Sequence, residues 1–405
     1  MPELRRLENE DINQLYRIHA IVFNQRRDFS SESYQIANPL AHPAEWAWGI
    51  FEGTKLIAGM YELDYLMRFD GHSVKMTGVS GVGTLPEARK GGHVRRIFEK
   101  ALPEEYEKGV VFSTLTPFSH DFYRKFGYEI ACARTHISIS TGDLYDIQAK
   151  GEFVHILPGD DTSQLAEVHS AYISNINQGI HRDYWPDNRA WKNFTNEDPY
   201  KTGVYLYLWK DETGKARSYI KYKDVEEDEH NMSVTELAFV DRKGLYGALS
   251  IVGGLSAQFE SLKWDMPTFI DPFDFMGDGW SVETETRPRD MIRVVNVKTA
   301  LELMRRPRCT CSCEGEYVIE VEDENLSANN GKYLVQFGTE GSKVSSTSRE
   351  PDMYCDIQTL SQLIIGYRSL ENAIYSRQEG LEVYDNEETL KSVFTLRPQH
   401  ITEYF

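Results

Sequence analysis

The amino-acid sequence predicts an α+β protein with mixed sheets, and two observations carry that prediction. The first is an internal repeat, which appears when the chain is compared with itself at an offset of 150 residues. Identical residues then align in five places, Leu7, Asp11, Gln14, Leu15 and His19 with Leu157, Asp161, Gln164, Leu165 and His169. The second is a C-terminal region of alternating stretches, YVIEVED and KYLVQFG, which predict strands separated by turns.

Each copy of the repeat has the same order of predicted elements. A short strand, an acidic turn and a helix with one apolar face come first. A hairpin follows, WAWGIFEGTKLIAGMYELDYL in the first copy and VYLYLWKDETGKARSYIKYKD in the second. Composition shifts near residue 285, where a strand and a helix begin a further α+β region. We therefore predict three domains, residues 1–150, 151–288 and 289–405.

Composition narrows the classes of function. The chain has 405 residues, of which 40% are hydrophobic, so it can bury large cores. Its net charge of −19 argues against a nucleic-acid binder and suits a cationic substrate. The N-terminus is too polar for a signal peptide, and no apolar run would span a bilayer, so we expect a cytoplasmic protein without a membrane partner.

The segment GVSGVGTLPEARKGGHVR, from Gly78 to Arg95, is the strongest candidate for a binding site. It reads as an apolar strand, a proline stop and a basic, glycine-rich entry into a helix. The first amides of a helix lack internal partners and face the positive end of its dipole, so such a turn suits a phosphate. Gly81 and Gly83 would permit a bulge or a close approach in the strand before the turn.

The matching segment of the second copy, TELAFVDRKGLYGALSIVGGL, lacks these features. It has no proline, and Arg242 and Lys243 come directly before Gly244, without the spacing from arginine to glycine that the first copy has. We predict that the second copy keeps the fold but has lost the cofactor site.

The basic turn resembles the pyrophosphate motif R-x-x-G-x-G/A of the GNAT superfamily of N-acetyltransferases, with Arg89 and Gly92 matching and Val94 departing. Together with Pro86 and the later segment YRKFGY, which starts at Tyr123, it resembles the Eis (enhanced intracellular survival) family. Gly81 and Gly91 depart from that family's usual residues, which leaves acyl-group preference and CoA affinity open.

The resemblance implies tandem GNAT domains, the second degenerate, followed by a sterol-carrier-like domain. It also implies acetyl-CoA as cosubstrate, a small cationic amine such as an aminoglycoside or polyamine as acceptor, and a homohexamer. Lysine acetylation of proteins, and a non-enzymatic carrier of apolar ligands using the C-terminal domain, stay open as alternatives.

Candidate site residues follow from the motifs and from the resemblance. Tyr123 is the candidate proton donor to the CoA thiolate, and the α-carboxylate of Phe405 is the candidate base for the acceptor amine. The amides of Val82 and Thr84 would position the thioester. The candidate cosubstrate-binding residues are Val82, Gly83, Thr84, Arg89, Lys90, Gly91, Gly92, His93, Val94, Arg95, Phe118 and Ser119.

No metal is expected. Cys309, Cys311 and Cys313 alternate, which places three thiols on one face of a strand. Zinc sites usually combine C-x₂₋₄-C pairs with a partner pair, and the only other nearby cysteine is Cys355. Five cysteines in a chain of this length also argue against a disulfide scaffold.

Overall fold

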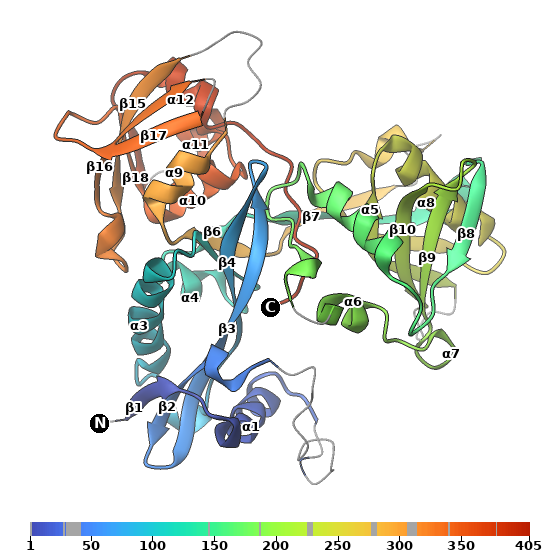
Figure 1. Ribbon diagram of the computed structural model, residues 1–405, viewed down its shortest axis with the longest axis horizontal. Helices are drawn as coiled ribbons and strands as arrows, with labels where there is room; N and C mark the ends of the chain where they lie inside the picture. Colours follow the sequence, from blue (N-terminus) through green and yellow to red (C-terminus); the bar gives the residue numbers. More distant parts are fainter. Residues whose placement is uncertain are drawn as a thin grey trace. The chain divides into compact units, whose positions relative to one another are not determined.

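A computed structural model describes residues 2–26, 29, 42–144, 146–185, 188–224, 230–276, 282–305, 314–338, 341–377 and 379–405. The chain forms two compact units. The first unit contains Met1–Ala131, Asp290–Arg397 and Glu403–Phe405, and the second contains Cys132–Arg289 and Pro398–Thr402. Three sheets with flanking helices build these units, which confirms the predicted α+β class (Figure 1).

The first unit holds a seven-stranded sheet in the order β1-β2-β3-β4-β5-β14-β6. The predicted hairpin is present as β2 and β3, which pair antiparallel about the turn at Gly53. The elements around this sheet are β1 (Glu3–Arg6), α1 (Ile12–Val22), β2 (Ala47–Glu52), β3 (Lys55–Phe69), β4 (His72–Thr84), α3 (His93–Glu107), β5 (Phe112–Leu115), α4 (His120–Arg124), β6 (Glu129–Ile130) and β14 (Met291–Val294).

The strand β14 comes from far along the chain. It pairs antiparallel with β5 on one side, from Met291–Leu115 to Val294–Phe112, and with β6 on the other. All four of its residues are buried. The first sheet is therefore completed by a segment that follows the whole second copy of the repeat.

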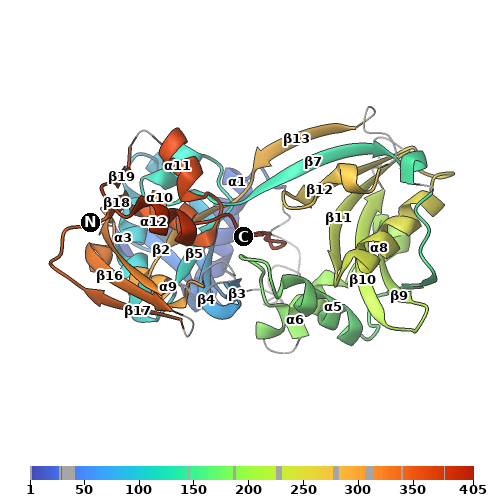
Figure 2. The same cartoon turned by 90° about the horizontal axis from the view of Figure 1, so that it is seen from above.

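The second unit has its own seven-stranded sheet, in the order β13-β7-β12-β11-β10-β9-β8. The hairpin predicted in the second copy of the repeat is present as β9 and β10. Figure 2 shows β7 and β13 running alongside each other, in agreement with their antiparallel pairing from Glu283–Ser138 to Pro288–Ala133. The elements are β7 (Ala133–Ser140), β8 (Gly151–His155), α5 (Ser163–Ile173), α6 (Arg189–Phe194), α7 (Pro199–Thr202), β9 (Val204–Asp211), β10 (Ala216–Asp224), β11 (Asn231–Phe239), α8 (Arg242–Gly254), β12 (Ser261–Pro267) and β13 (Glu283–Pro288).

The two sheets divide the chain differently from the predicted boundaries. β7 lies within the predicted first domain but pairs in the second sheet, and β14 lies within the predicted third domain but pairs in the first. Short buried strands of this kind carry no local signal of the sheet that they join, because the partner is set by non-local packing. The boundaries at residues 150 and 288 stay a prediction.

The C-terminal part of the first unit is a third α+β layer. Its five-stranded sheet has the order β17-β16-β15-β18-β19, and the apolar helix α10 packs against it and against β14. The elements are α9 (Val297–Leu303), β15 (Gly315–Glu322), β16 (Gly331–Gly338), β17 (Gly341–Ser346), β18 (Met353–Asp356), α10 (Ile357–Ile365), α11 (Leu370–Ser376), β19 (Leu381–Val383) and α12 (Glu387–Val393).

Candidate active site

The C-terminal end of β4 separates from its neighbour β5. The parallel pairing of the two strands runs from Met76–Phe112 to Val79–Leu115 and stops there, whereas β4 continues to Thr84. Among the described residues, the last part of β4 therefore pairs through its β3 edge, and the β5 edge is left for a ligand to contact.

A β-bulge bends this end of β4, as the glycines predicted. The register with β3 shifts between Gly59 and Tyr61, opposite Gly81, which has a φ of +61°. The Nε2–H of His19 donates to the Gly81 carbonyl at 2.8 Å. A Cβ at Gly81 would lie 2.5 Å from that same nitrogen, so both the backbone angle and the close approach require glycine.

The turn after β4 exposes the N-terminus of α3. Lys90 and Gly92 both adopt positive φ, 68° and 71°, so the chain turns sharply before the helix. The first helical hydrogen bond runs from the Arg96 amide to the Gly92 carbonyl, at 3.1 Å. The amides of residues 93–95 therefore have no acceptor within the helix, and Gly92 provides no side chain to cap them.

A pocket of about 670 Å³ lies where this helix end meets the bulged strand. Its volume is typical of small-molecule sites. Every predicted cosubstrate residue except Ser119 lines it. The lining consists of Val22, Phe23, Val82, Gly83, Thr84, Ala88, Arg89, Lys90, Gly91, Gly92, His93, Val94, Arg95, Phe118, Phe122, Lys125 and Phe126.

Four cations surround the pocket: Arg89, Lys90, Arg95 and Lys125, all of them exposed. Arg95 also lies 5.6 Å from the centroid of the Phe126 ring. Arg96, by contrast, donates to the carbonyl of Pro2 at 2.9 Å and so faces away from this group. With the open helix N-terminus, the four side chains make a site for a multiply charged anion.

Tyr123 lies behind the aromatic wall of the pocket. It is 3% exposed on α4, and its ring makes edge-to-face contacts with Phe118 and Phe122 at 5.4 and 5.1 Å between centroids. Burial raises the pKa of its phenol, so Tyr123 holds its proton at neutral pH. It does not line the pocket itself, whereas Phe118, which is 66% exposed, does.

Ser119, also predicted to contact the cosubstrate, caps a helix. Its hydroxyl accepts a hydrogen bond from the Phe122 amide at 3.4 Å, at the N-terminus of α4. Serine is among the residues preferred at helix N-caps, because its hydroxyl can accept from a free amide of the first turn.

Phe405 packs on the first sheet, next to the strand that lines the pocket. Its ring meets the ring of Tyr65 edge to face, at 5.2 Å between centroids. A Cβ at Gly78 would lie 2.5 Å from Phe405 Cδ1, so the absence of a side chain on β4 makes room for this ring. The last residue therefore contacts β3 and β4 by its side chain.

The chain just before Phe405 is held within the second unit. The Asn177 amide donates to the Pro398 carbonyl at 2.9 Å, and the His400 amide donates to the Asn177 carbonyl at 3.1 Å. Two arginines, Arg134 and Arg289, both donate to the Ile401 carbonyl. The side chain of His400 also bonds the Tyr172 hydroxyl at 2.8 Å. The tail is an ordered segment with buried polar contacts.

Sequence reasoning missed several lining residues. Val22 and Phe23 come from the end of α1, and their place at the pocket follows from packing that no local pattern reveals. Phe122 comes just before the quoted segment YRKFGY, and Lys125 and Phe126 lie within it. A signal was present in the sequence, because two aromatic residues and a lysine lie within four positions of the candidate Tyr123.

The equivalent turn of the second copy is built differently. The Asp241 side chain accepts from the Gly244 amide at 2.9 Å and so caps α8. The same carboxylate pairs with Arg217 at 2.8 Å. His169, which aligns with His19, is 2% exposed and packs edge to face on Trp191. A carboxylate of the protein thus stands at this helix N-terminus, where an anionic ligand would have to bind.

The described part of the chain has neither a metal-binding cluster nor a membrane-spanning helix. No group of three or more His, Cys, Asp and Glu side chains in these ranges is arranged to hold a metal ion. Cys309, Cys311 and Cys313 lie outside the described residues. None of the helices in the same ranges is long and apolar enough to span a membrane.

Comparisons with known proteins agree with this geometry. Residues 3–131 match the family described as an acetyltransferase (GNAT) domain, and residues 297–401 match the family described as a sterol carrier protein domain. A protein of Streptomyces griseus named an uncharacterized N-acetyltransferase is 21% identical over 358 residues, which covers 80% of this chain and 81% of that protein.

Solved structures share the fold over the whole chain. A probable N-acyltransferase from Enterococcus faecalis is 20% identical with a TM-score of 0.86, and covers 100% of both chains. A GCN5-related N-acetyltransferase from Anabaena variabilis is 20% identical with a TM-score of 0.84, also over 100% of both chains. Eis1 from Mycobacterium abscessus is 17% identical with a TM-score of 0.81, again over 100% of both.

The fold, the matched domains and the named relatives confirm the resemblance that the motifs predicted. Residues 3–131 are a GNAT acetyltransferase domain, residues 297–401 are a sterol carrier protein domain, and the whole chain shares its fold with solved structures named as N-acyl- and N-acetyltransferases.

Proposed function

We propose that the protein transfers the acetyl group of acetyl-CoA directly to a primary amine of a small cationic acceptor, such as an aminoglycoside or a polyamine. The observation that carries this proposal is the pocket at the end of β4, which combines an uncapped helix N-terminus with four exposed cations. Those groups would bind the pyrophosphate, while the β4 edge at Val82–Thr84 would contact the pantetheine amides.

In the proposed reaction, the acceptor nitrogen attacks the thioester carbonyl, the new C–N bond forms and the C–S bond breaks. The departing thiolate takes a proton from the Tyr123 hydroxyl, which then regains one from solvent. The α-carboxylate of Phe405 removes a proton from the acceptor amine. The phenol is protonated at neutral pH, as a proton donor must be, and burial keeps it so by raising its pKa.

The acceptor class is supported by the net charge of −19, which attracts cations over the surface as a whole. A homohexameric assembly and a cytoplasmic location belong to the same proposal. The assembly comes from the resemblance to the Eis family, and the location from a sequence without an apolar run long enough to span a bilayer.

A calorimetric titration with acetyl-CoA, followed by a transfer assay over aminoglycosides, polyamines and lysine peptides, tests the proposal. We expect one acetyl-CoA bound per chain and turnover of the small amines. Absence of acetyl-CoA binding would end the enzyme interpretation, and turnover of lysine peptides alone would replace the acceptor.

Variants at the two proposed catalytic groups test the mechanism. Tyr123→Phe should lower kcat about 100-fold or more and leave acetyl-CoA binding unchanged, since it removes only the transferable proton. Tyr375→Phe, at a tyrosine that is 87% exposed on α11, is the matched control and should have no effect. An unchanged kcat in Tyr123→Phe would remove this residue from the mechanism.

The tail allows the ring and the carboxylate to be separated. An extra glycine added after Phe405 keeps the ring but moves the carboxylate, and should lower kcat about 100-fold. Phe405→Ala keeps a terminal carboxylate but loses the contact with Tyr65, and should have a smaller effect. Equal activity of the extended chain and the parent would show that the carboxylate is not the base.

A further inference from the structure

The helix that carries Tyr123 is too short to hold its own position. α4 spans five residues, His120–Arg124, and an isolated helix of that length is unstable in water. Its last carbonyl groups also need donors from elsewhere. The position of the Tyr123 hydroxyl therefore depends on whatever binds the C-terminal end of α4 and the turn that follows.

Two side chains bond the carbonyls at this end. Gln358, on α10 of the C-terminal domain, donates through Nε2 to the Arg124 carbonyl at 3.2 Å. Arg293, on β14, donates through Nη1 to the Phe126 carbonyl at 2.5 Å. Gly127 comes next, with a φ of +80°, and a Cβ there would lie 2.8 Å from the same Arg293 nitrogen. The turn after α4 therefore packs directly against the Arg293 guanidinium, and a side chain at Gly127 would clash with it.

The charge of Arg293 is balanced by the C-terminal domain. Arg293 and Asp323 form an ion pair in which both side chains are 0% exposed. Asp323, in the segment after β15, is fixed in turn by the amides of Asn325 and Leu326 at 3.0 and 3.1 Å. A buried pair of this kind is costly to break, because the remaining charge would be left without a partner.

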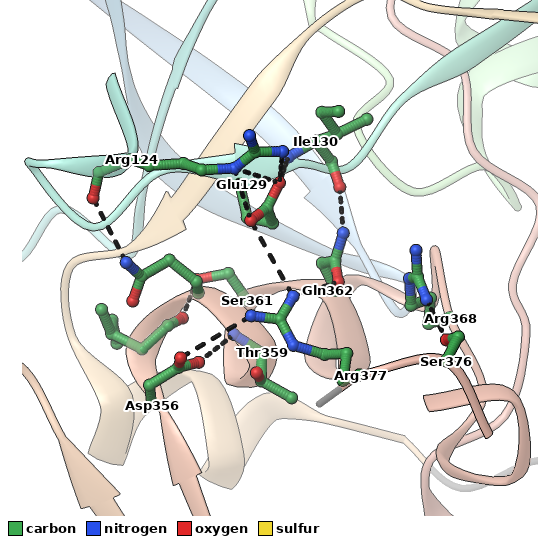
Figure 3. Close-up of polar contacts among 12 residues, drawn as sticks. Arg124, Glu129, Ile130, Asp356, Thr359, Ser361, Gln362, Arg368, Ser376 and Arg377 are labelled. Carbon is green, nitrogen blue, oxygen red and sulfur yellow. Dashed lines mark hydrogen bonds and ion pairs between the residues drawn. The ribbon is translucent and has the colours of Figure 1, made fainter. Parts of the chain in front are cut away.

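A second set of contacts joins α4 and β6 to the same domain (Figure 3). Arg124 binds the Glu129 carboxylate through two nitrogens, at 3.0 and 2.9 Å. Arg377, at the end of α11, lies 3.8 Å from Glu129 and 3.6 Å from Asp356, the residue that caps α10. Gln362 donates to the Ile130 carbonyl at 2.6 Å. In Figure 3 these side chains converge from α4 and β6 on one side and α10 and α11 on the other.

The pocket depends on the same helix. Phe122, Lys125 and Phe126 belong to α4 or to the turn after it, and all three line the pocket. We propose that the sterol-carrier-like domain positions the helix of Tyr123 in the acetyltransferase domain, with Gln358 and Arg377 as positioning residues; this inference rests on the catalytic role proposed for Tyr123. A misplacement of about 1 Å can lower a rate about 100-fold, so small contacts at this interface would act on kcat.

Gln358 and Arg377 are the residues to change, because the buried Arg293–Asp323 pair would endanger folding. The test uses the full chain and compares Gln358→Ala, Arg377→Ala and Arg377→Lys. Matched controls in the same domain are Gln336→Ala and Arg349→Ala, whose exposed side chains bond Glu316 at 3.1 and 2.6 Å and do not reach α4. The rate is expressed per acetyl-CoA-binding site, so that loss of folded protein does not count.

We expect kcat to fall about 10-fold in Gln358→Ala and Arg377→Ala, with partial recovery in Arg377→Lys and with KM for acetyl-CoA changed less than about threefold. In the free protein, hydrogen exchange of residues 118–130 should accelerate in the two alanine variants and stay unchanged in the controls. Normal kcat per site together with normal exchange in Gln358→Ala and Arg377→Ala would overturn the proposal.

The proposed function can fail separately. A parent chain without transfer activity would overturn the proposed reaction. A fully active Tyr123→Phe variant would overturn the role of Tyr123 as proton donor. In both cases the hydrogen-exchange prediction is tested independently. Faster hydrogen exchange without any change in kcat would show that Gln358 and Arg377 only stabilise the structure of this region. That result would also overturn their positioning role.

Discussion

The turn before α3 and the turn before α8 join corresponding elements of the two repeat copies, and they treat their helix N-termini in opposite ways. Before α3, Gly92 leaves the first amides uncapped, and exposed cations surround them. Before α8, the Asp241 carboxylate accepts from the Gly244 amide and pairs with Arg217. The Asp241 carboxylate stands where an anionic ligand would have to bind, so we expect the second copy to keep its fold without binding CoA.

The largest effect should come from placing a carboxylate in the turn before α3, as Asp241 does in the turn before α8. Gly92→Asp places a carboxylate beside the open amides, in a space where nothing lies within 4 Å of the new Cβ. We expect acetyl-CoA to bind about 10- to 100-fold more weakly, as measured by calorimetry. Gly92→Asn is the control, since it has the same shape and tolerates the same positive φ without the charge. Equal affinities of the two variants would mean that the charge of this turn does not matter.

The bulge at Gly81 should be the next most sensitive feature. Gly81→Ala combines a strained φ with a Cβ 2.5 Å from His19 Nε2, so either the His19 side chain or β4 must move. We expect a loss of about 1–3 kcal/mol in stability and about a 10-fold weaker acetyl-CoA affinity. Gly53→Ala has a similar φ, +60°, with nothing within 4 Å, and should lose stability without losing affinity. Calorimetry and thermal unfolding of both variants separate strain from binding.

Acid should destabilise the second unit through His169. Burial, helped by the charge of Arg182, lowers the pKa of His169 from 6.5 to about 3. Below pH 6.5 the unfolded chain therefore binds a proton that the folded chain refuses, and stability falls as pH falls towards 3. The slope approaches about 1.4 kcal/mol per pH unit for one such group. Burial lowers the pKa of His400 as well, which steepens the same trend.

Hydrogen exchange of the α5 amides between pH 7 and pH 5 measures this slope. His169→Gln should flatten it. His136→Gln, at a partly exposed histidine that bonds Asp265 at 2.8 Å, is the control and should keep the steep slope of the parent. An identical slope in His169→Gln and the parent would exclude His169 as its source.

The smallest effect should follow from uncapping the second turn. Asp241→Ala removes one cap and one partly exposed ion pair, and should cost about 1 kcal/mol of stability. Asp241→Asn keeps a capping side chain and should cost less. Neither should change kcat, because this helix end takes no part in the proposed reaction. Calorimetry measures how many acetyl-CoA molecules bind per chain. A second acetyl-CoA bound by Asp241→Ala would mean that the Asp241 cap alone prevents binding at the second copy.

The parts of the molecule that local patterns encode could be predicted from the sequence. The strand, turn and helix from Gly78 to Arg95 follow from an apolar run, a proline and a basic, glycine-rich turn, and Gly81 and Gly83 indicated a bulge or a close approach. The resemblance to a known family supplied Tyr123 and Phe405. Local patterns could not supply what depends on distant neighbours: Val22 reaches the pocket through the packing of α1, for example. The sheet to which β14 belongs could not be predicted either. Its four residues, Met291–Val294, carry no signal that they pair with β5 and β6.

The placement of β14 has a consequence for biosynthesis. The ribosome releases β5 and β6 long before it makes residues 291–294, so the position between these two strands is empty while residues 132–289 are being translated. Open strand edges invite pairing with other chains, and late pairing between distant segments is slow. Nascent chains should therefore need chaperone protection until β14 emerges. Fragments that stop near residue 150 should aggregate, although they contain every residue proposed to bind CoA.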